Sequence, residues 1–292
     1  MNLLQLIEKS TKKLSQVLYP SRPSQEWADY ITNQRNEIDK IDCSNFKSFL
    51  MDLQRQGATE KELFAMVDDI DVDLQPNRKT NTGGRLPPAY QEPQIMGEGI
   101  GVYFAKSAHE QAAAVFSYIA LATQLRSFGA PTNLIEQCQS AAKDNILHAK
   151  IMQELSEMEG VFVPSFHYVP TSQSILEVAM QNAVDGCIYE TWAALLANWQ
   201  STHLPSDPEL QTVYEQIGKN KAMHGQLAWD LHFWFLSKLR TREKKQLSRA
   251  QSKAIAQLLL AEGNISYVAG LGLPLSHEKK VLSSVFCAQL VA

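Results

Sequence analysis

The stretch VDGCIYETWAALLANW, at residues 184–199, is the part of the sequence that decides the fold class. Its apolar residues recur three and four positions apart, which is the spacing of a buried helix face. We expect it to lie inside a helix from about residue 172 to residue 200. Three other long segments have the same spacing, at about 103–128, 132–159 and 208–239, and no strand pattern competes with them. The sequence therefore predicts an all-α protein.

The connections indicate how these helices are arranged. A short turn, GAP at residues 129–131, separates the first two segments, whereas the longest connection, VFVPSFHYVPT at residues 161–171, separates the second from the third. Short turns join antiparallel neighbours, and a longer connection can cross a bundle. We therefore expect a four-helix bundle with its crossover at about residues 160–171. A further helix is expected at about 242–262, followed by a tail containing Gly and Pro.

The first third of the chain differs from the rest. Up to about residue 68, short helical patterns alternate with Pro and Gly, and none looks able to fold alone. Residues 68–93 then combine the acidic run DDIDVD with PNRKTNTGGRLPP, a composition that favours an exposed connection. We therefore expect an N-terminal helical extension and linker at residues 1–95. The bundle, with an extra C-terminal helix, is expected at residues 96–292.

Composition and charge argue against several classes of protein. The 292 residues are 45% hydrophobic and carry a net charge of -4. We find no clustered basic stripe and therefore expect no nucleic-acid partner. The most apolar segment is too short to cross a bilayer of about 30 Å, and the N-terminus lacks a signal-peptide pattern, so we expect no membrane association. The four cysteines are scattered without a CxxC pair, which favours a reducing, cytoplasmic setting.

Each of the four bundle helices carries one residue suited to a site in the core: Glu110, His148, Glu190 and His224. A di-metal site in a bundle needs one inward carboxylate on each of two helices and a Glu-x-x-His turn on each of the other two. The alternation of Glu and His along the four helices fits that requirement. A single Glu or His in a helix is more often structural, so the prediction rests on the order, the spacing and the apolar setting together.

This pattern resembles the ferritin-like diiron-carboxylate superfamily over about residues 100–240. Residues 186–191, GCIYET, are similar to a Gly-Cys-x-x-Glu-Thr pattern in the third helix of bacterial members. His148 and His224 are similar to the histidines of the second-helix and fourth-helix motifs. The resemblance implies a ferritin-like four-helix bundle in which the metal ligands are Glu110, His148, Glu190 and His224.

The chain departs from this family at both bridging carboxylates. The family has Glu three residues before each histidine, whereas this chain has Asn145 and Lys221. The loss of two acids and the gain of an ammonium disfavour a pair of divalent cations. Asp144 keeps the acid that, in the family, supports the histidine of the opposite motif, while its counterpart on the fourth helix is Asn220.

Two alternatives remain for the centre of the bundle. Either the four ligand candidates hold a single iron or manganese ion, or Lys221 neutralises a carboxylate in the absence of any metal. The residues expected to carry chemistry are Glu110, Glu190, Lys221 and Asp144.

Two functions from different classes follow from the resemblance. The first is an oxidoreductase or oxygenase-like enzyme that acts on a small-molecule substrate inside the bundle with at most one metal ion. The second is a non-catalytic, degenerate ferritin-like protein that binds a partner and has a packed, salt-bridged centre. Fold does not decide between them, and the sequence leaves homo-oligomer formation open.

Overall fold

The structure is a computed structural model that describes residues 84–88, 90–166, 171–204, 207–260 and 269–291. These residues are helical with no strand among them, which confirms the all-α prediction. The helices expected before residue 68 and the DDIDVD run lie outside the described residues.

Four of the expected helical segments begin and end close to their predicted bounds. α9 begins at Pro208, a residue tolerated in the first turn because its missing N–H has no helical partner there. The side chain of Asp207 caps this helix by accepting a hydrogen bond from the N–H of Leu210 at 2.9 Å. The four helices are α5 (Ile100–Ser127), α6 (Thr132–Met158), α9 (Pro208–Lys238) and α10 (Thr241–Leu260).

The third expected segment is one continuous helical run whose middle is a π-helix. α7 (Ile175–Gln181) leads into the π-helix η1 (Asn182–Glu190), which leads into α8 (Thr191–His203). π-helices are rare, usually a single turn long, and are found at functional sites in many proteins. The Thr191 side chain donates a hydrogen bond of 2.8 Å to the carbonyl of Cys187, close to the point where the α-helix resumes. Glu190 is the last residue of the π-helix.

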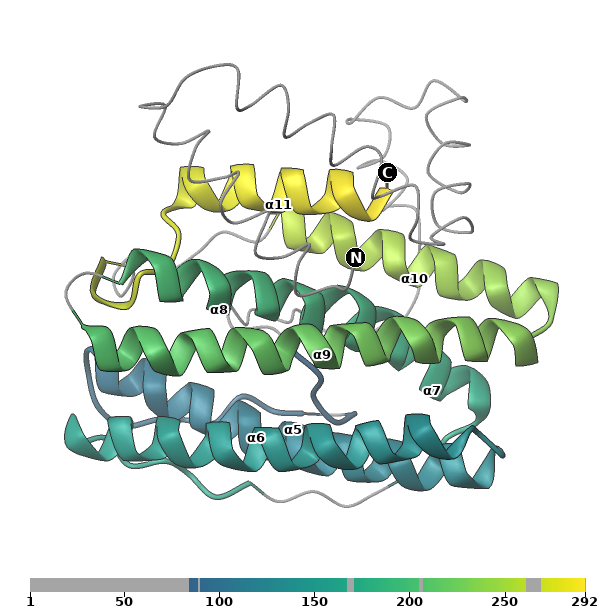
Figure 1. Cartoon of the computed structure of the whole chain (residues 1–292), viewed down its shortest axis with the longest axis horizontal. Helices are drawn as coiled ribbons and strands as arrows, with labels where there is room; N and C mark the ends of the chain where they lie inside the picture. Colours follow the sequence, from purple (N-terminus) through teal and green to yellow (C-terminus); the bar gives the residue numbers. More distant parts are fainter. Residues whose placement is uncertain (1–83, 89, 167–170, 205–206, 261–268, 292) are drawn as a thin grey trace.

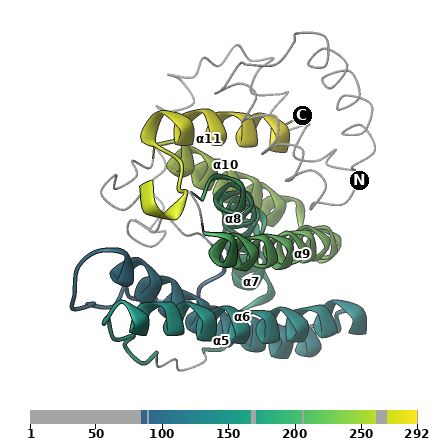
Figure 2. The ribbon, with the colours of Figure 1, turned by 60° about the vertical axis from the view of Figure 1, so that its left-hand side comes forward.

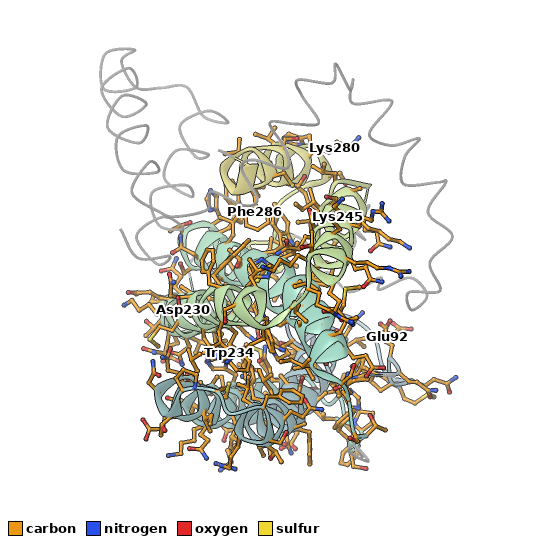
Figure 3. The ribbon with its side chains drawn as sticks, turned by 90° about the vertical axis from the view of Figure 1, so that its right-hand side faces the viewer. Glu92, Asp230, Trp234, Lys245, Lys280 and Phe286 are labelled. Carbon is orange, nitrogen blue, oxygen red and sulfur yellow. The ribbon has the colours of Figure 1, made fainter. Side chains whose placement is uncertain are left out.

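The helices form three layers (Figures 1 and 2). α5 and α6 make up the first layer, α7, α8 and α9 the second, and α10 with α11 (Ser276–Val291) the third. Apolar side chains such as Leu121 and Leu231 fill the space between the first two layers. Trp192 and Phe286 pack between the second and third, with ring centroids 5.5 Å apart. Figure 3 shows Phe286 where α11 meets the layer below it. The predicted site therefore lies between the first two layers, in the four-helix part.

The expected Gly- and Pro-containing tail is only partly correct. After a short 3-10 turn, η3 (Ala269–Leu271), the chain forms the additional helix α11. The apolar residues Leu282 and Phe286 of α11 are buried against the bundle. The cluster of Gly and Pro that suggested a tail instead marks the connection before this helix.

The expectation of an exposed connection is wrong for residues 84–87, which are buried. Arg85 is only 2% exposed, and Leu86 is 5% exposed. The reason is that polar groups of the bundle core form hydrogen bonds with the Arg85 side chain and with its backbone N–H, as described below. Residues 84–87 therefore pack with the bundle that the sequence analysis begins at residue 96.

α10 carries a row of basic residues that the sequence analysis overlooked. Arg242, Lys245 and Arg249 are exposed and stand three and four positions apart, so they share one face of the helix. Figure 3 shows Lys245 on the outer side of α10. The opposite face buries Leu247, Ala254 and other apolar residues. In the sequence the three basic residues are separated by Glu243, Lys244, Gln246, Leu247 and Ser248, so they form a row only once the segment is helical.

Membrane insertion is not indicated by the described helices. None of them combines the length and apolar character needed to span a bilayer.

Candidate functional site

A buried ion pair between Glu190 and Lys221 lies at the centre of the four-helix part. The Lys221 Nζ is 3.1 Å from Glu190 Oε2 and donates a hydrogen bond of 3.4 Å to Oε1. The Glu190 side chain is 0% exposed, and the Lys221 side chain is 3% exposed. This is the ion pair expected if Lys221 neutralises a carboxylate in the centre. Breaking such a pair from one side leaves an uncompensated buried charge, so the two residues must be considered together.

Two further groups hold the Glu190 carboxylate. The backbone N–H of Arg85 donates to Oε1 at 3.2 Å, and the Tyr118 hydroxyl donates to the same oxygen at 3.1 Å. Burial by itself would raise the pKa of Glu190, but the charges of Lys221 and His224 and the hydrogen bonds from the Arg85 backbone and the Lys221 side chain lower it to about 2. Glu190 is therefore a carboxylate at neutral pH. Burial and the neighbouring negative charge of Glu190 raise the pKa of Tyr118 well above its ordinary value, so Tyr118 stays a hydroxyl donor.

The segment at residues 84–87 reaches this centre because Gly186 of the π-helix leaves room for the Arg85 side chain. The guanidinium of Arg85 hydrogen-bonds the Asn182 side-chain oxygen at 2.5 Å and lies 5.4 Å from the centre of the Tyr118 ring. Gly186 lies directly beneath it, since a Cβ at this position would be 2.5 Å from Arg85 Nη2 and 2.7 Å from the Cβ of Ala228. Gly186 is therefore required for close packing between η1, α9 and the Arg85 segment.

Asn145 faces the same ammonium from α6. Its Oδ1 accepts a hydrogen bond of 3.2 Å from Lys221 Nζ, and its Nδ2 donates one of 2.7 Å to the carbonyl of Ala141. The side chain is fully buried. Asn145 and Lys221, which stand where the resemblance would place bridging carboxylates, are therefore in direct contact.

His224 is supported by Asp144, as the resemblance implies. The two side chains are joined between Nε2 and Oδ2 at 3.0 Å. The hydrogen bond from His224 is the main cause of the lowered pKa of Asp144. Because the carboxylate only accepts hydrogen bonds, Nε2 of His224 carries a proton.

His148 has the opposite hydrogen-bond pattern. Its Nε2 lies 3.1 Å from the Asn220 Nδ2, and the Asn220 oxygen already accepts a hydrogen bond of 2.8 Å from Gln216. Burial and the nearby charge of Lys221 lower the pKa of His148 to about 3, so the ring is neutral. Nε2 then accepts a proton from the Asn220 amide, and Nδ1 of His148 carries the ring proton.

The structure brings His148, Glu190 and His224 close enough for their charges to act on one another, together with Lys221 and Asp144. Glu110 is also buried, at 3% exposed, and its charge acts on Tyr103, one of the groups in the same four-helix part. Burial is the main cause of the raised pKa of Tyr103, and Glu110 adds to it. The roles that the sequence analysis gives to these residues in catalysis remain predictions.

The residues present do not fit the two-metal centre that the resemblance implies. Among the described residues, no group of three or more His, Cys, Asp or Glu side chains is arranged to hold a metal ion. The positions where the resemblance places bridging carboxylates hold the amide of Asn145 and the ammonium of Lys221, neither of which is an anionic ligand. The predicted ligand set of Glu110, His148, Glu190 and His224 therefore lacks the donor geometry of a metal site in this part of the chain.

Comparison of the chain with protein-family models, with curated proteins and with solved structures finds no match.

Sequence reasoning missed two groups that shape this site. Arg85 lies in a stretch with the composition of a linker, and it meets Asn182 across 97 residues of chain. The π-helix was missed because periodicity distinguishes helix from strand but not one kind of helix from another. One usable signal was the pair of Gly84 and Gly186, since both allow close approach to polar groups in the core.

Proposed function

We propose that this protein is a degenerate ferritin-like bundle that works without a metal ion and serves as a binding or interaction protein. The observation that carries the proposal is the Lys221 ammonium placed against Glu190, with both groups shielded from water. In this centre the ammonium supplies the positive charge that a cation would otherwise supply.

The ferritin-like assignment is supported by the order and pairing of the helices. α5 packs beside α6, a long connection follows, and α8 packs beside α9. The Asp144–His224 pair supports it further, because α6 then supplies an acid to a histidine of α9, as in the family's motifs.

The basic row on α10 is the surface we assign to partner binding. The α9–α10 corner at residues 238–249 holds six basic residues and one acidic residue, Glu243, which is paired with Arg240. The chain as a whole has a net charge of -4, so the rest of it is acidic. A long polyanion would extend beyond the row and meet that acidic surface. A short acidic segment of a protein partner avoids this repulsion, so it is the partner the charge distribution favours.

Metal independence can be tested with an engineered variant that restores both Glu-x-x-His turns. Protein purified without chelator, after growth with added iron and manganese, should contain no stoichiometric transition metal. The double variant Asn145→Glu, Lys221→Glu should take up metal, because it returns two carboxylates to the bridging positions. One or more tightly bound ions per chain in the parent protein would overturn the proposal.

Partner binding can be tested with a labelled poly-glutamate peptide of about 15 residues, long enough to cover the row if helical at 1.5 Å per residue. The charge-reversed variant Arg242→Glu, Lys245→Glu, Arg249→Glu should bind it about tenfold more weakly or worse, since each contact is a surface ion pair. A matched control reverses three exposed basic residues of the opposite layer, Arg126, Lys143 and Lys150. Equal loss in both variants, or tighter binding of duplex DNA or anionic vesicles than of the peptide, would contradict an acidic protein partner.

A second candidate, the oxidoreductase predicted from the sequence, has one observation in its favour. His148 and His224 are buried, and within the described residues the Nδ1 atoms of both lack a hydrogen-bond partner. Unsatisfied polar atoms beside a π-helix are features of functional sites. This candidate predicts oxygen consumption with a small reductant that is abolished by Glu190→Gln, whereas the binding proposal predicts none above a heat-treated sample.

A further inference from the structure

Three side chains at the centre have the functional groups of a condensation reaction. They are the amine of Lys221, the carboxamide of Asn145 and the carboxylate of Glu190. Lys221 Nζ lies 3.2 Å from Asn145 Oδ1 and 3.1 Å from Glu190 Oε2. All three residues are at most 2% exposed. Neither the ferritin-like resemblance nor the proposed function gives a reason for an amine to be held against a carboxamide in this way.

The orientation of the Asn145 amide is fixed by its own hydrogen bonds. Nδ2 donates to the carbonyl of Ala141 at 2.7 Å, so Oδ1 is the atom that faces Lys221. The carbonyl carbon Cγ is bonded directly to Oδ1. The amine is therefore held against the oxygen of the amide it would attack and reaches Cγ by moving from that oxygen to the face of the amide, so the two groups need no encounter from solution.

The neighbours of Glu190 keep water away from this contact. Tyr118 and the backbone of Arg85 occupy Oε1, and a Cβ at Gly84 would lie only 3.4 Å from both Glu190 Oε2 and Lys221 Nζ. The ion pair is the resting state, and the neutral amine forms when Glu190 takes a proton from the ammonium. In such a dry setting this transfer turns two buried charges into two neutral groups, which offsets part of its cost.

We propose that Lys221 and Asn145 form an isopeptide bond, which covalently joins α9 to α6. The link spans 76 residues of sequence. It goes beyond the proposed function and does not depend on it, because it requires only these three side chains and their burial. The ion pair of Lys221 and Glu190 is the state of the chain before the reaction, and in the product a neutral amide and a protonated Glu190 replace it.

The reaction is balanced without any further reactant. Glu190 takes one proton from the Lys221 ammonium, and the resulting neutral amine attacks Cγ of Asn145. The new bond is Nζ–Cγ, and the bond that breaks is Cγ–Nδ2. Glu190 passes a proton to the departing nitrogen, while the remaining extra proton of Nζ is taken up by the carboxylate. Nδ2 leaves as ammonia, and no oxidant or reductant takes part.

The mass of the intact, freshly purified chain tests the proposal directly. The chain should be about 17 Da lighter than its sequence requires, the mass of one ammonia. Proteolysis should yield one branched peptide that contains both Lys221 and Asn145. Cyclisation of a single Asn or Gln also removes ammonia, but that loss maps to one unbranched peptide. A full-mass chain after several days in the folded state, or a loss confined to an unbranched peptide, would overturn the proposal.

Variants then assign the part played by each group. Glu190→Gln keeps the size of the side chain but removes the proton acceptor, and Lys221→Arg keeps the charge but removes the amine. Both should have the full mass in chains whose helical circular dichroism matches the parent. Lys219→Met, two positions from Lys221 on an exposed part of α9, should retain the loss of ammonia. Because the readout is mass and not metal content, failure here leaves the metal test of the proposed function unaffected.

Discussion

α6 and α9 are joined by two histidines with different partners, and the comparison between them shows how far this centre departs from a metal site. His224 of α9 is held by the carboxylate of Asp144 on α6, whereas His148 of α6 is held by the amide of Asn220 on α9. An acid partner requires a proton on Nε2. An amide that donates requires a lone pair on Nε2, which moves the ring proton to Nδ1.

The two histidines therefore differ in which ring nitrogen carries the proton. On the His224 side an acid accepts the ring proton of Nε2, while on the His148 side the Asn220 amide donates to Nε2 and leaves the ring proton on Nδ1. In α9, Asn220 and Lys221 are adjacent, and His224 follows three residues after Lys221. The two positions at which α9 differs from the fourth-helix motif that it resembles are therefore neighbours. On the α9 side of the centre, Asn220 and Lys221 both donate hydrogen bonds.

The largest effect on stability is expected when the ammonium paired with Glu190 is removed. Lys221→Met should lower the free energy of unfolding by roughly 3 kcal/mol or more, because it leaves the Glu190 carboxylate buried without its counter-ion. Urea denaturation at pH 7.5 measures it. The control is Lys219→Met, whose exposed ion pair with Glu215 should contribute less than about 0.5 kcal/mol. Similar losses in the two variants would mean that Lys221 is not a buried charge partner.

Much of this arrangement could be predicted from the sequence. Helical periodicity and the Gly and Pro stops gave the bounds of α5, α6, α9 and α10 to within a few residues. The resemblance to the ferritin-like motifs implied that Asp144 supports the histidine of the opposite motif, and Asp144 contacts His224. The sign of the charges predicted that Lys221 would need an acid nearby.

The rest depends on contacts between distant parts of the chain. Arg85 is buried only because Asn182 and Tyr118 receive its guanidinium, and nothing in the local sequence around residue 85 reports this. The close approach of η1 to α9 and to Arg85 depends on the small volume of Gly186. The direction of the hydrogen bond at His148 depends on Gln216, which fixes the amide of Asn220 from one turn earlier in α9.

The next effect is expected at acid pH, where His148 should make the free energy of unfolding depend on pH. The pKa of His148 is lowered from 6.5 to about 3, so below pH 6.5 the unfolded chain binds a proton that the folded chain does not. The free energy of unfolding should therefore fall as the pH decreases from 6.5 toward 3, by about 1.4 kcal/mol per pH unit from this residue. His148→Gln should remove that part of the slope between pH 6 and pH 4.5.

His232 gives an independent comparison for this pH dependence. It is buried outside the centre, its pKa is lowered to about 4 by burial, and it should contribute a slope of the same sign. The variants His148→Gln and His232→Gln should each flatten the profile, and together they should flatten it further. An unchanged slope in His148→Gln would show that His148 is protonated in the folded protein.

A smaller effect is expected at the acid that supports His224. Asp144→Asn should cost about 1 kcal/mol at pH 7, the value of one hydrogen bond whose acceptor is partly exposed. The folded pKa of Asp144 is lowered, so its contribution is present above the unfolded value and is lost as the pH falls through the folded value. The difference between parent and variant should consequently shrink below about pH 4. A difference that is constant across this range would indicate loss of packing only.

The smallest change in stability, and the sharpest test of the comparison, is expected from Asn220→Asp. This substitution gives His148 the same kind of partner that His224 has, while Gln216 can still donate to one carboxylate oxygen. The ring proton of His148 should then move from Nδ1 to Nε2, because the new partner accepts and cannot donate. The nearby negative charge should also raise the pKa of His148 above its present value of about 3. Stability at pH 7 should change by less than about 1 kcal/mol, since a hydrogen bond of similar geometry is retained. Nitrogen chemical shifts of the imidazole distinguish the two tautomers directly, with His224 in the same sample as an internal reference for the acid-supported ring. If the His148 shifts of the variant match those of the parent, then Asn220 does not set the tautomer, and the contrast between the two histidines has another cause.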